Sequence, residues 1–271
     1  DRLRSRGLGD VYKRQADTLA AMRLAKQAGA FTIAIVNVVS STIAREADGV
    51  LYTWAGPEIA VATTKAYSAQ LAALYLISVK IARVRGLISI GDERALCAEL
   101  QRLPECVTEA LKCQPDMQRI ATLYANRPSV FFLGRGLDYA AALEASLKLK
   151  EISYIHSEAY AAGELKHGTI SLIEDGTLVI GTLTQSALYE KTVSNMVECK
   201  SRGAYLMGLT TYGNYETEDT CDFTVYIPKT DAHFTASLAV IPLQLLGYYV
   251  SVAKGLDVDK PRNLAKSVTV E

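Results

Sequence analysis

The sequence predicts an α/β protein with two parallel β-sheets, each covered by helices. Short β-branched strands alternate with helices along most of the chain, an order that is typical of parallel sheets. The same order of elements occurs twice at a constant offset of 174 residues, which indicates an internal duplication. Three identical pairs keep that offset: Gly29 and Gly203, Asp48 and Asp222, and Gln70 and Gln244.

The first copy follows a basic head at residues 1–15, which has no stable period. We expect this head to be a scar or an artefact outside the fold. Gly29 ends the first predicted helix, and Thr63 lies where the last one begins. The expected elements are a helix at 17–28, a strand at 31–36, a short helix, a strand at 49–53 and a long helix.

A helical connector and a fuller second copy come next. Pro104 and Pro115 are expected to break the helices between residues 86 and 124. The second copy has a front half that the first lacks, so we expect the first copy to be incomplete. Its elements are a strand at 130–133, a glycine turn at 134–136, a helix at 139–152, strands at 177–181, 204–209 and 223–227, and helices at 187–202 and 236–253.

Composition argues against several classes of function. Acidic and basic residues balance at 29 each, so no excess charge attracts nucleic acid. The five cysteines form no Cys-x-x-Cys pair, which argues against a disulfide framework and a zinc site, and no metal or cofactor is expected. The apolar stretch at 69–79 is too short to cross a bilayer, and no secretory leader is visible. We therefore expect a soluble, cytoplasmic protein.

Acid, base and amine groups are concentrated at residues 148–167, which hold three lysines, three glutamates and two of the three histidines. Lys148 and Glu151 lie three residues apart on a predicted helix and share a face. They form either a surface ion pair or, given the small residues that follow, a partly buried pair suited to proton transfer. His167, in a glycine-bracketed loop, is either polar surface or a group that titrates near neutral pH in a site. His156 and His233 are assigned structural roles.

Three other segments have a functional interpretation and a structural one. The turn at 134–136 resembles the start of a dinucleotide fingerprint, but Tyr139 stands where the third glycine belongs; anion binding and plain strand-to-helix geometry are the alternatives. Lys266 has two interpretations. Either it lies in a solvated tail, or apolar neighbours dock the tail and leave the lysine amine desolvated, so that the amine can attack carbonyl groups. Thr63 caps a helix, or it holds an anionic or hydroxylated ligand.

Three motifs resemble the glutamine:fructose-6-phosphate aminotransferase (isomerizing) family. They are Glu-Ala-Ser-Leu-Lys-Leu-Lys-Glu-Ile at 144–152, Ala-Tyr-Ala-Ala-Gly-Glu-Leu-Lys-His-Gly at 159–168 and Pro-Arg-Asn-Leu-Ala-Lys-Ser-Val-Thr-Val-Glu at 261–271. The resemblance covers residues 16–271 and implies two sugar-isomerase (SIS) subdomains of three-layer, flavodoxin-like αβα build with parallel sheets. The expected boundaries are a head at 1–15, a partial first SIS domain at 16–90, a helical connector at 91–121, a second SIS domain at 122–255 and a C-terminal active-site tail at 256–271.

The resemblance also implies a reaction. Fructose 6-phosphate is opened, aminated at C2 by ammonia from glutamine, and isomerised to glucosamine 6-phosphate. By position, Glu151 matches the base that moves a proton between C1 and C2, and Lys148 matches a lysine near O1. Lys266 matches the lysine that forms an imine with the open sugar, and His167 matches the ring-opening histidine supplied by a neighbouring subunit, so a homodimer is implied. The implied substrate-binding positions are Val61, Thr63, where the family has serine, and Ala265.

Three departures from the family pattern affect the expected activity. The family's Ser-Gln-Ser-Gly-x-Thr phosphate turn is replaced at residues 10–15, and the first strand and helix of the first copy are missing. The glutaminase cysteine is also missing, so that domain would have to belong to the same full-length chain. We expect residues 1–271 alone to have little or no activity. The alternatives are a non-catalytic SIS module that binds a sugar phosphate, and an SIS enzyme that cleaves sugar-amine phosphates.

Overall fold

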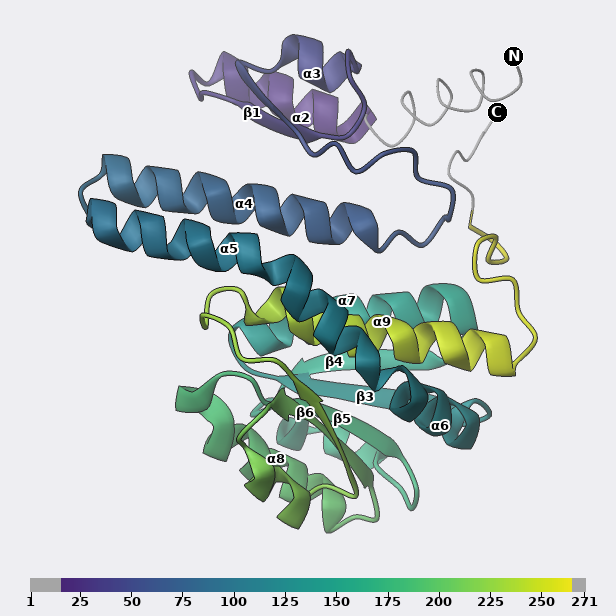
Figure 1. Ribbon diagram of the computed structural model, residues 1–271. Helices are drawn as coiled ribbons and strands as arrows, with labels where there is room; N and C mark the ends of the chain where they lie inside the picture. Colours follow the sequence, from purple (N-terminus) through teal and green to yellow (C-terminus); the bar gives the residue numbers. More distant parts are fainter. Residues whose placement is uncertain (1–15, 265–271) are drawn as a thin grey trace. The chain divides into compact units, whose positions relative to one another are not determined.

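The computed structural model describes residues 16–264, which divide into two compact units (Figure 1). The first unit holds the described residues up to Ile81 and those from Asp259 onward, and the second is Ala82–Val258. Both units are α/β, and every strand pair in them is parallel. The predicted fold class is therefore confirmed.

The first unit contains a two-stranded sheet within its described residues. Gly29, at φ +82°, ends the first helix, and Ser41 caps the short helix by accepting a hydrogen bond from the Ala44 amide at 3.3 Å. The elements are α2 (Ala16–Gln27), β1 (Ile33–Val36), α3 (Thr42–Glu46), β2 (Gly49–Tyr52) and α4 (Lys65–Val84), whose last turn belongs to the second unit.

The second unit is built on a five-stranded sheet in the order β4-β3-β5-β6-β7. Figure 1 shows α7 and α9 on one face of this sheet and α8 on the other. The strands are β3 (Ser129–Gly134), β4 (His156–Ala161), β5 (Leu178–Thr182), β6 (Tyr205–Thr211) and β7 (Phe223–Ile227). The helices are α5 (Ile90–Ala110), α6 (Gln114–Tyr124), α7 (Leu137–Ser153), α8 (Tyr189–Lys200) and α9 (Thr235–Ala253), with single turns η1 (Leu111–Cys113), η2 (Leu165–His167), η3 (Thr169–Leu172), η4 (Ser186–Leu188) and η5 (Tyr215–Asp219).

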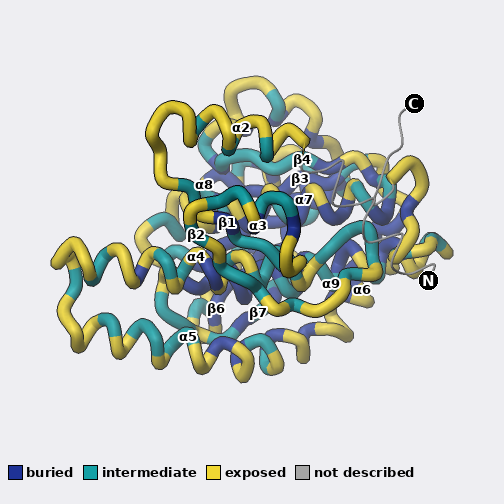
Figure 2. Tube along the Cα trace, turned by 90° about the horizontal axis from the view of Figure 1, so that it is seen from above, coloured by how far each residue is buried: buried dark blue, intermediate teal, exposed yellow. Residues whose placement is uncertain are grey.

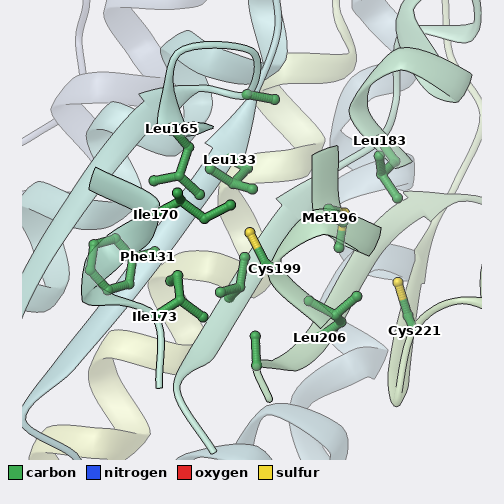
Figure 3. Close-up of a cluster of buried hydrophobic side chains, with 13 residues drawn as sticks. Phe131, Leu133, Leu165, Ile170, Ile173, Leu183, Met196, Cys199, Leu206 and Cys221 are labelled. Carbon is green, nitrogen blue, oxygen red and sulfur yellow. The ribbon is translucent and has the colours of Figure 1, made fainter. Parts of the chain in front are cut away.

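Buried side chains are concentrated in the second unit, where Figure 2 shows them along β3 and α7. One cluster packs Met196 and Cys199 of α8 against Phe131 and Leu133 of β3 (Figure 3). Burial raises the pKa of the Cys199 thiol to about 11 and that of Cys221 to about 12. Both therefore remain protonated, unreactive thiols at neutral pH.

The internal duplication is confirmed by strand register. Ile33 pairs with Gly49 in the first sheet, and Met207 pairs with Phe223 in the second, so both partners are displaced by 174 residues. The hydrogen bonds before the strands repeat at the same offset. These are Thr32 N to Asp48 Oδ2 (2.9 Å) with Leu206 N to Asp222 Oδ2 (2.8 Å), and the ion pairs Lys26–Asp48 (2.8 Å) and Lys200–Asp222 (3.1 Å).

Two expectations about the connector and the second copy need correction. The expected break at Pro104 is wrong, because α5 continues through this proline. A proline inside a helix costs about 3 kcal/mol or more, and the rest of the helix offsets that cost. Pro115 lies in the first turn of α6, where proline is tolerated, and the break there is confirmed. In addition, the segment after α7, where no strand was predicted, contains β4, an edge strand paired with β3.

Among the described residues, α9 is the one helix long and apolar enough to cross a membrane. More than half of its apolar window is buried, and it packs against α6 and α7 on one face of the sheet. The core helix of an α/β domain has this same length and composition. Burial within the unit accounts for its apolar character.

Candidate active site

The candidate site begins with a charged ladder on α7. Lys148 Nζ lies 2.5 Å from Glu151 Oε2 and 3.7 Å from Glu144 Oε1. The Lys148 side chain is 8% exposed, Glu144 is 13% and Glu151 is 24%. The i, i+3 and i, i+4 spacings place all three groups on one side of the helix. Because the ammonium is almost fully buried, this pair is not an ordinary solvated surface bridge.

Electrostatics make the two carboxylates unequal. Burial raises the pKa of Glu144, the neighbouring charge of Glu151 adds to the shift, and the Lys148 ammonium opposes it. Glu151 holds the lysine closely and is more open to solvent. A carboxylate in that setting has free lone pairs with which to accept a proton from a ligand.

The C-terminal end of α7, which carries Glu151, is held on several sides. Tyr154 adopts the left-handed conformation at φ +61° and ends the helix. Lys254 Nζ, at the end of α9, donates to the Ser153 carbonyl at 2.7 Å, which satisfies a terminal acceptor of α7. On the sheet side, Ser146 and Ser157 donate to each other's carbonyl oxygens at 2.9 and 2.8 Å and join α7 to β4. The helix is thus a rigid support for the Lys148–Glu151 pair.

His167 lies on the single turn η2, two loops after α7. Leu165, 1% exposed, anchors this turn in the core, and the His167 amide donates to the Glu164 carbonyl at 3.1 Å. The imidazole itself is exposed. The structure therefore brings Lys148 and Glu151 together and presents His167 at the surface.

The glycine turn at 134–136 has a structural explanation. A Cβ on Gly134 would lie 2.5 Å from the carbonyl carbon of Asp138, so α7 packs on β3 as closely as glycine allows. The buried Asp138 carboxylate accepts hydrogen bonds from the Thr184 amide at 2.8 Å, the Thr184 hydroxyl at 2.5 Å and the Gln185 amide at 3.2 Å. An internal carboxylate thus takes the two backbone amides that follow β5, those of Thr184 and Gln185. These contacts favour strand-to-helix geometry over anion or dinucleotide binding.

Two predicted substrate contacts lie in the first unit. The Val61 amide donates to the Asp259 carbonyl at 3.1 Å, so the first residues of the C-terminal tail lie beside Val61. Thr63 Oγ1 accepts a hydrogen bond from the Ala66 amide at 3.3 Å and donates a hydrogen bond to the Glu58 carboxylate. Its hydroxyl caps the start of α4. Ala265 and Lys266 fall outside the described residues.

The other two histidines and the possible metal ligands add little to the candidate site. His156 and His233 are exposed and lie 3.6 Å from Glu158 and 2.6 Å from Asp231. Within residues 16–264, no group of three or more His, Cys, Asp or Glu side chains could hold a metal ion. Glu144 is the group near Lys148 for which the sequence reasoning assigned no role. Its spacing of four residues from Lys148 is the signal that could have found it.

Comparison with known proteins decides the family. The SIS domain model matches residues 11–80 and 123–254. The chain belongs to the SIS domain family. Glutamine–fructose-6-phosphate aminotransferase (isomerizing) from Caldanaerobacter subterraneus subsp. tengcongensis is 56% identical over 256 residues, covering 94% of this chain and 42% of the relative. The same enzyme from Clostridium tetani shows equal identity and coverage. This SIS protein therefore spans about two fifths of the length of these relatives.

Solved structures of SIS proteins support the same placement. The C-terminal domain of glucosamine-fructose-6-phosphate aminotransferase from Francisella tularensis superposes with a TM-score of 0.86 at 36% identity, covering 91% of this chain and 70% of that one. Glucosamine-6-phosphate deaminase from Thermotoga maritima gives a TM-score of 0.71 at 28% identity, covering 93% and 71%. The SIS fold of this chain is thus shared with proteins of more than one named activity.

Proposed function

We propose that this chain is the isomerase part of a glutamine:fructose-6-phosphate aminotransferase. The whole protein would convert fructose 6-phosphate and ammonia to glucosamine 6-phosphate in the cytoplasm, with ammonia supplied by a glutaminase domain of the same full-length chain. The observation that carries this proposal is the buried Lys148–Glu151 pair on α7, in a chain 56% identical to enzymes of that name.

In the proposed mechanism, Glu151 acts as the base. Its carboxylate removes a proton from C1 of the open-chain fructose imine and returns it to C2, so Glu151 is unchanged at the end of the cycle. Lys148 holds Glu151 in place and lies near O1. The support is geometric: a half-open carboxylate on a rigid helix end, paired to a buried amine at 2.5 Å.

Lys266 is the proposed imine-forming lysine. Its amine would attack the open-chain C2 carbonyl with loss of water, and ammonia would then displace the lysine amine from C2, so that the proton transfer takes place on the sugar's own imine and the lysine is released. The hydrogen bond between Val61 and Asp259 supports the proposal that the tail starts beside a substrate-binding segment. Borohydride reduction in the presence of fructose 6-phosphate tests this step. In a protein completed with the preceding part of the Caldanaerobacter relative, we expect trapped sugar on Lys266 and none after Lys266→Arg.

His167 is the proposed ring-opening group, acting in the neighbouring subunit of a homodimer. Its exposed position on an anchored turn supports this role, since the imidazole is presented outward while Leu165 holds the backbone. In a protein completed with the preceding part of the Caldanaerobacter relative, mixing inactive His167→Ala with inactive Glu151→Gln subunits should restore part of the activity in heterodimers. Failure of that complementation would argue against a shared site.

A chimera tests the whole proposal. Residues 16–271 are joined to the preceding part of the Caldanaerobacter relative, which supplies the length that this chain does not span. We expect the chimera to form glucosamine 6-phosphate from fructose 6-phosphate and glutamine, and residues 1–271 alone to form little or none. Formation of product by residues 1–271 alone would refute the proposed inactivity.

The Thermotoga structure favours one second candidate, a sugar-amine phosphate deaminase. Ammonia release from glucosamine 6-phosphate without any synthase activity in the chimera would support it. The non-catalytic sugar-phosphate module is tested by Glu151→Gln, which would leave the function of such a module intact and abolish that of either enzyme.

A further inference from the structure

Arg135 lies against the loop at 161–168, which presents His167. The arginine follows β3 in the glycine turn, and a Cβ on Gly163 would lie only 2.6 Å from Arg135 Nη2. The absence of a side chain at Gly163 therefore lets the guanidinium pack directly on the loop. His167 comes four residues later, so the arginine supports the start of the loop that carries the imidazole.

A second contact ties this arginine to α8. Arg135 Nη2 donates to Asn195 Oδ1 at 2.8 Å, and Asn195 Nδ2 donates in turn to Glu198 Oε1 at 3.3 Å. Asn195 is 7% exposed, and the next residue, Met196, packs in one buried cluster with Leu165 of the loop (Figure 3). The loop is therefore joined to α8 twice, through the arginine and through the cluster.

The guanidinium is partly withdrawn from water. Its Nε–H group is buried and has no hydrogen-bond partner among residues 16–264. An unpaired buried donor costs free energy, which an arginine with its fork turned to solvent would avoid. The Ala162 amide donates to the Gly134 carbonyl at 2.9 Å and holds the loop closed against the turn that carries Arg135. The contact between arginine and loop is thus built into the fold.

We propose that Arg135 is a positioning residue that fixes the loop and thereby sets the place of the His167 imidazole. This inference rests on the proposed function, in which His167 opens the sugar ring. Without the guanidinium fork, Gly163 loses its support while Leu165 still anchors the turn, so the loop would loosen without unfolding. The defect should then fall on ring opening and spare the proton transfer by Glu151.

Two substrates separate ring opening from the later steps. Fructose 6-phosphate closes its ring through O5, whereas 5-deoxyfructose 6-phosphate lacks that oxygen and stays open-chain. In the chimera, Arg135→Met should lower kcat/KM for fructose 6-phosphate by about 10–100-fold, because a 1 Å misplacement of a catalytic group costs up to about 10²-fold. With the open-chain analogue, kcat/KM should stay within about threefold of the unsubstituted chimera. Arg94→Met, an exposed arginine on α5, is the matched control and should leave both values unchanged.

A double-mutant cycle tests the contact itself. In Gly163→Ala the new Cβ displaces the guanidinium, so this variant should lose kcat/KM for fructose 6-phosphate as Arg135→Met does. Combining the two substitutions removes the clash, and the loss should be no greater than in Arg135→Met alone. Hydrogen exchange of the peptide containing residues 161–168, in residues 1–271, follows the loop without any activity. Exchange should be faster in Arg135→Met and unchanged in Arg94→Met.

Each outcome decides one part of the inference. Equal losses with both substrates in Arg135→Met, additive losses in the double variant, or unchanged exchange of the loop would overturn the role of Arg135. His167→Ala should show the same selective loss with fructose 6-phosphate. An inactive unsubstituted chimera, or equal losses with both substrates in His167→Ala, would instead reject the proposed function, and loop exchange would still decide whether Arg135 fixes the loop.

Discussion

Gly134 offers the sharpest test of how the fold positions α7. In Gly134→Ala the new Cβ would lie 2.5 Å from the Asp138 carbonyl carbon and 2.6 Å from the Tyr139 nitrogen. These are backbone atoms at the start of α7, which no side-chain rotation can move. Relieving the clash requires α7 to shift from β3 by about 1 Å, and overpacking of this kind costs about 1–3 kcal/mol, or more where backbone must move.

Gly247 provides the matched control on the other side of α7. In Gly247→Ala the Cβ would meet Ile152 and Leu149 at 3.6–3.7 Å, which is ordinary contact, and the position lies inside helix α9. Alanine is favoured over glycine in a helix by about 1 kcal/mol, so this variant should be neutral or more stable.

The assay is urea unfolding of the protein followed by circular dichroism. We expect the midpoint of the transition to fall in Gly134→Ala and to stay constant or rise in Gly247→Ala. In the chimera, Gly134→Ala should also lower kcat, because a 1 Å displacement of catalytic groups costs up to about 10²-fold. Equal midpoints for Gly134→Ala and the wild type would refute the close packing of α7 on β3.

Three further predictions follow from single contacts. Lys254→Met removes the hydrogen bond to the Ser153 carbonyl and should lower the free energy of unfolding by about 1–2 kcal/mol, measured by urea titration. Arg102 and Thr230 hold the pKa of Glu99 at about 2, below its usual 4.5. The ionised Glu99 therefore stabilises the fold above pH 4.5, and this contribution is lost as the pH falls toward 2. Glu99→Gln should flatten the pH dependence of the free energy of unfolding in that window. Alkylation at pH 8 with peptide mass spectrometry should modify the half-buried Cys97 well before Cys199 or Cys221, and equal rates would contradict their burial.

Local patterns predicted most of the helices and strands of both copies. The glycine stops at Gly29 and Gly203 and the β-branched runs after them located β1 and β6, and the repeated aspartates located the start of β2 and β7. Strand β6 carries its own signal because a strand buried on both faces reads as a continuous apolar run. The shared register of the two copies follows from the duplication.

Elements fixed by tertiary contacts were not predictable in this way. Strand β4 lacks the β-branched residues that mark a strand, and pairing with β3 and the reciprocal bonds of Ser146 and Ser157 hold it in place. Pro104 signals a break, yet α5 passes through it.

The candidate site was partly predictable for the same reason. The spacing of Lys148 and Glu151 predicted a shared helix face, and the small residues after them indicated close packing. The burial of Lys148 depends on which face of α7 meets the sheet and α9, which local sequence does not specify. The second carboxylate, Glu144, becomes significant once that burial is seen.

Transfer of hydrogen between C1 and C2 is the most direct test of the central claim that Glu151 is the base. The chimera is given fructose 6-phosphate deuterated at C1, and the label arriving at C2 or lost to water is followed by NMR. In Glu151→Gln we expect both transfer and exchange to fall by at least about 10²-fold while the sugar phosphate still binds. Transfer at the wild-type rate in that variant would contradict the account.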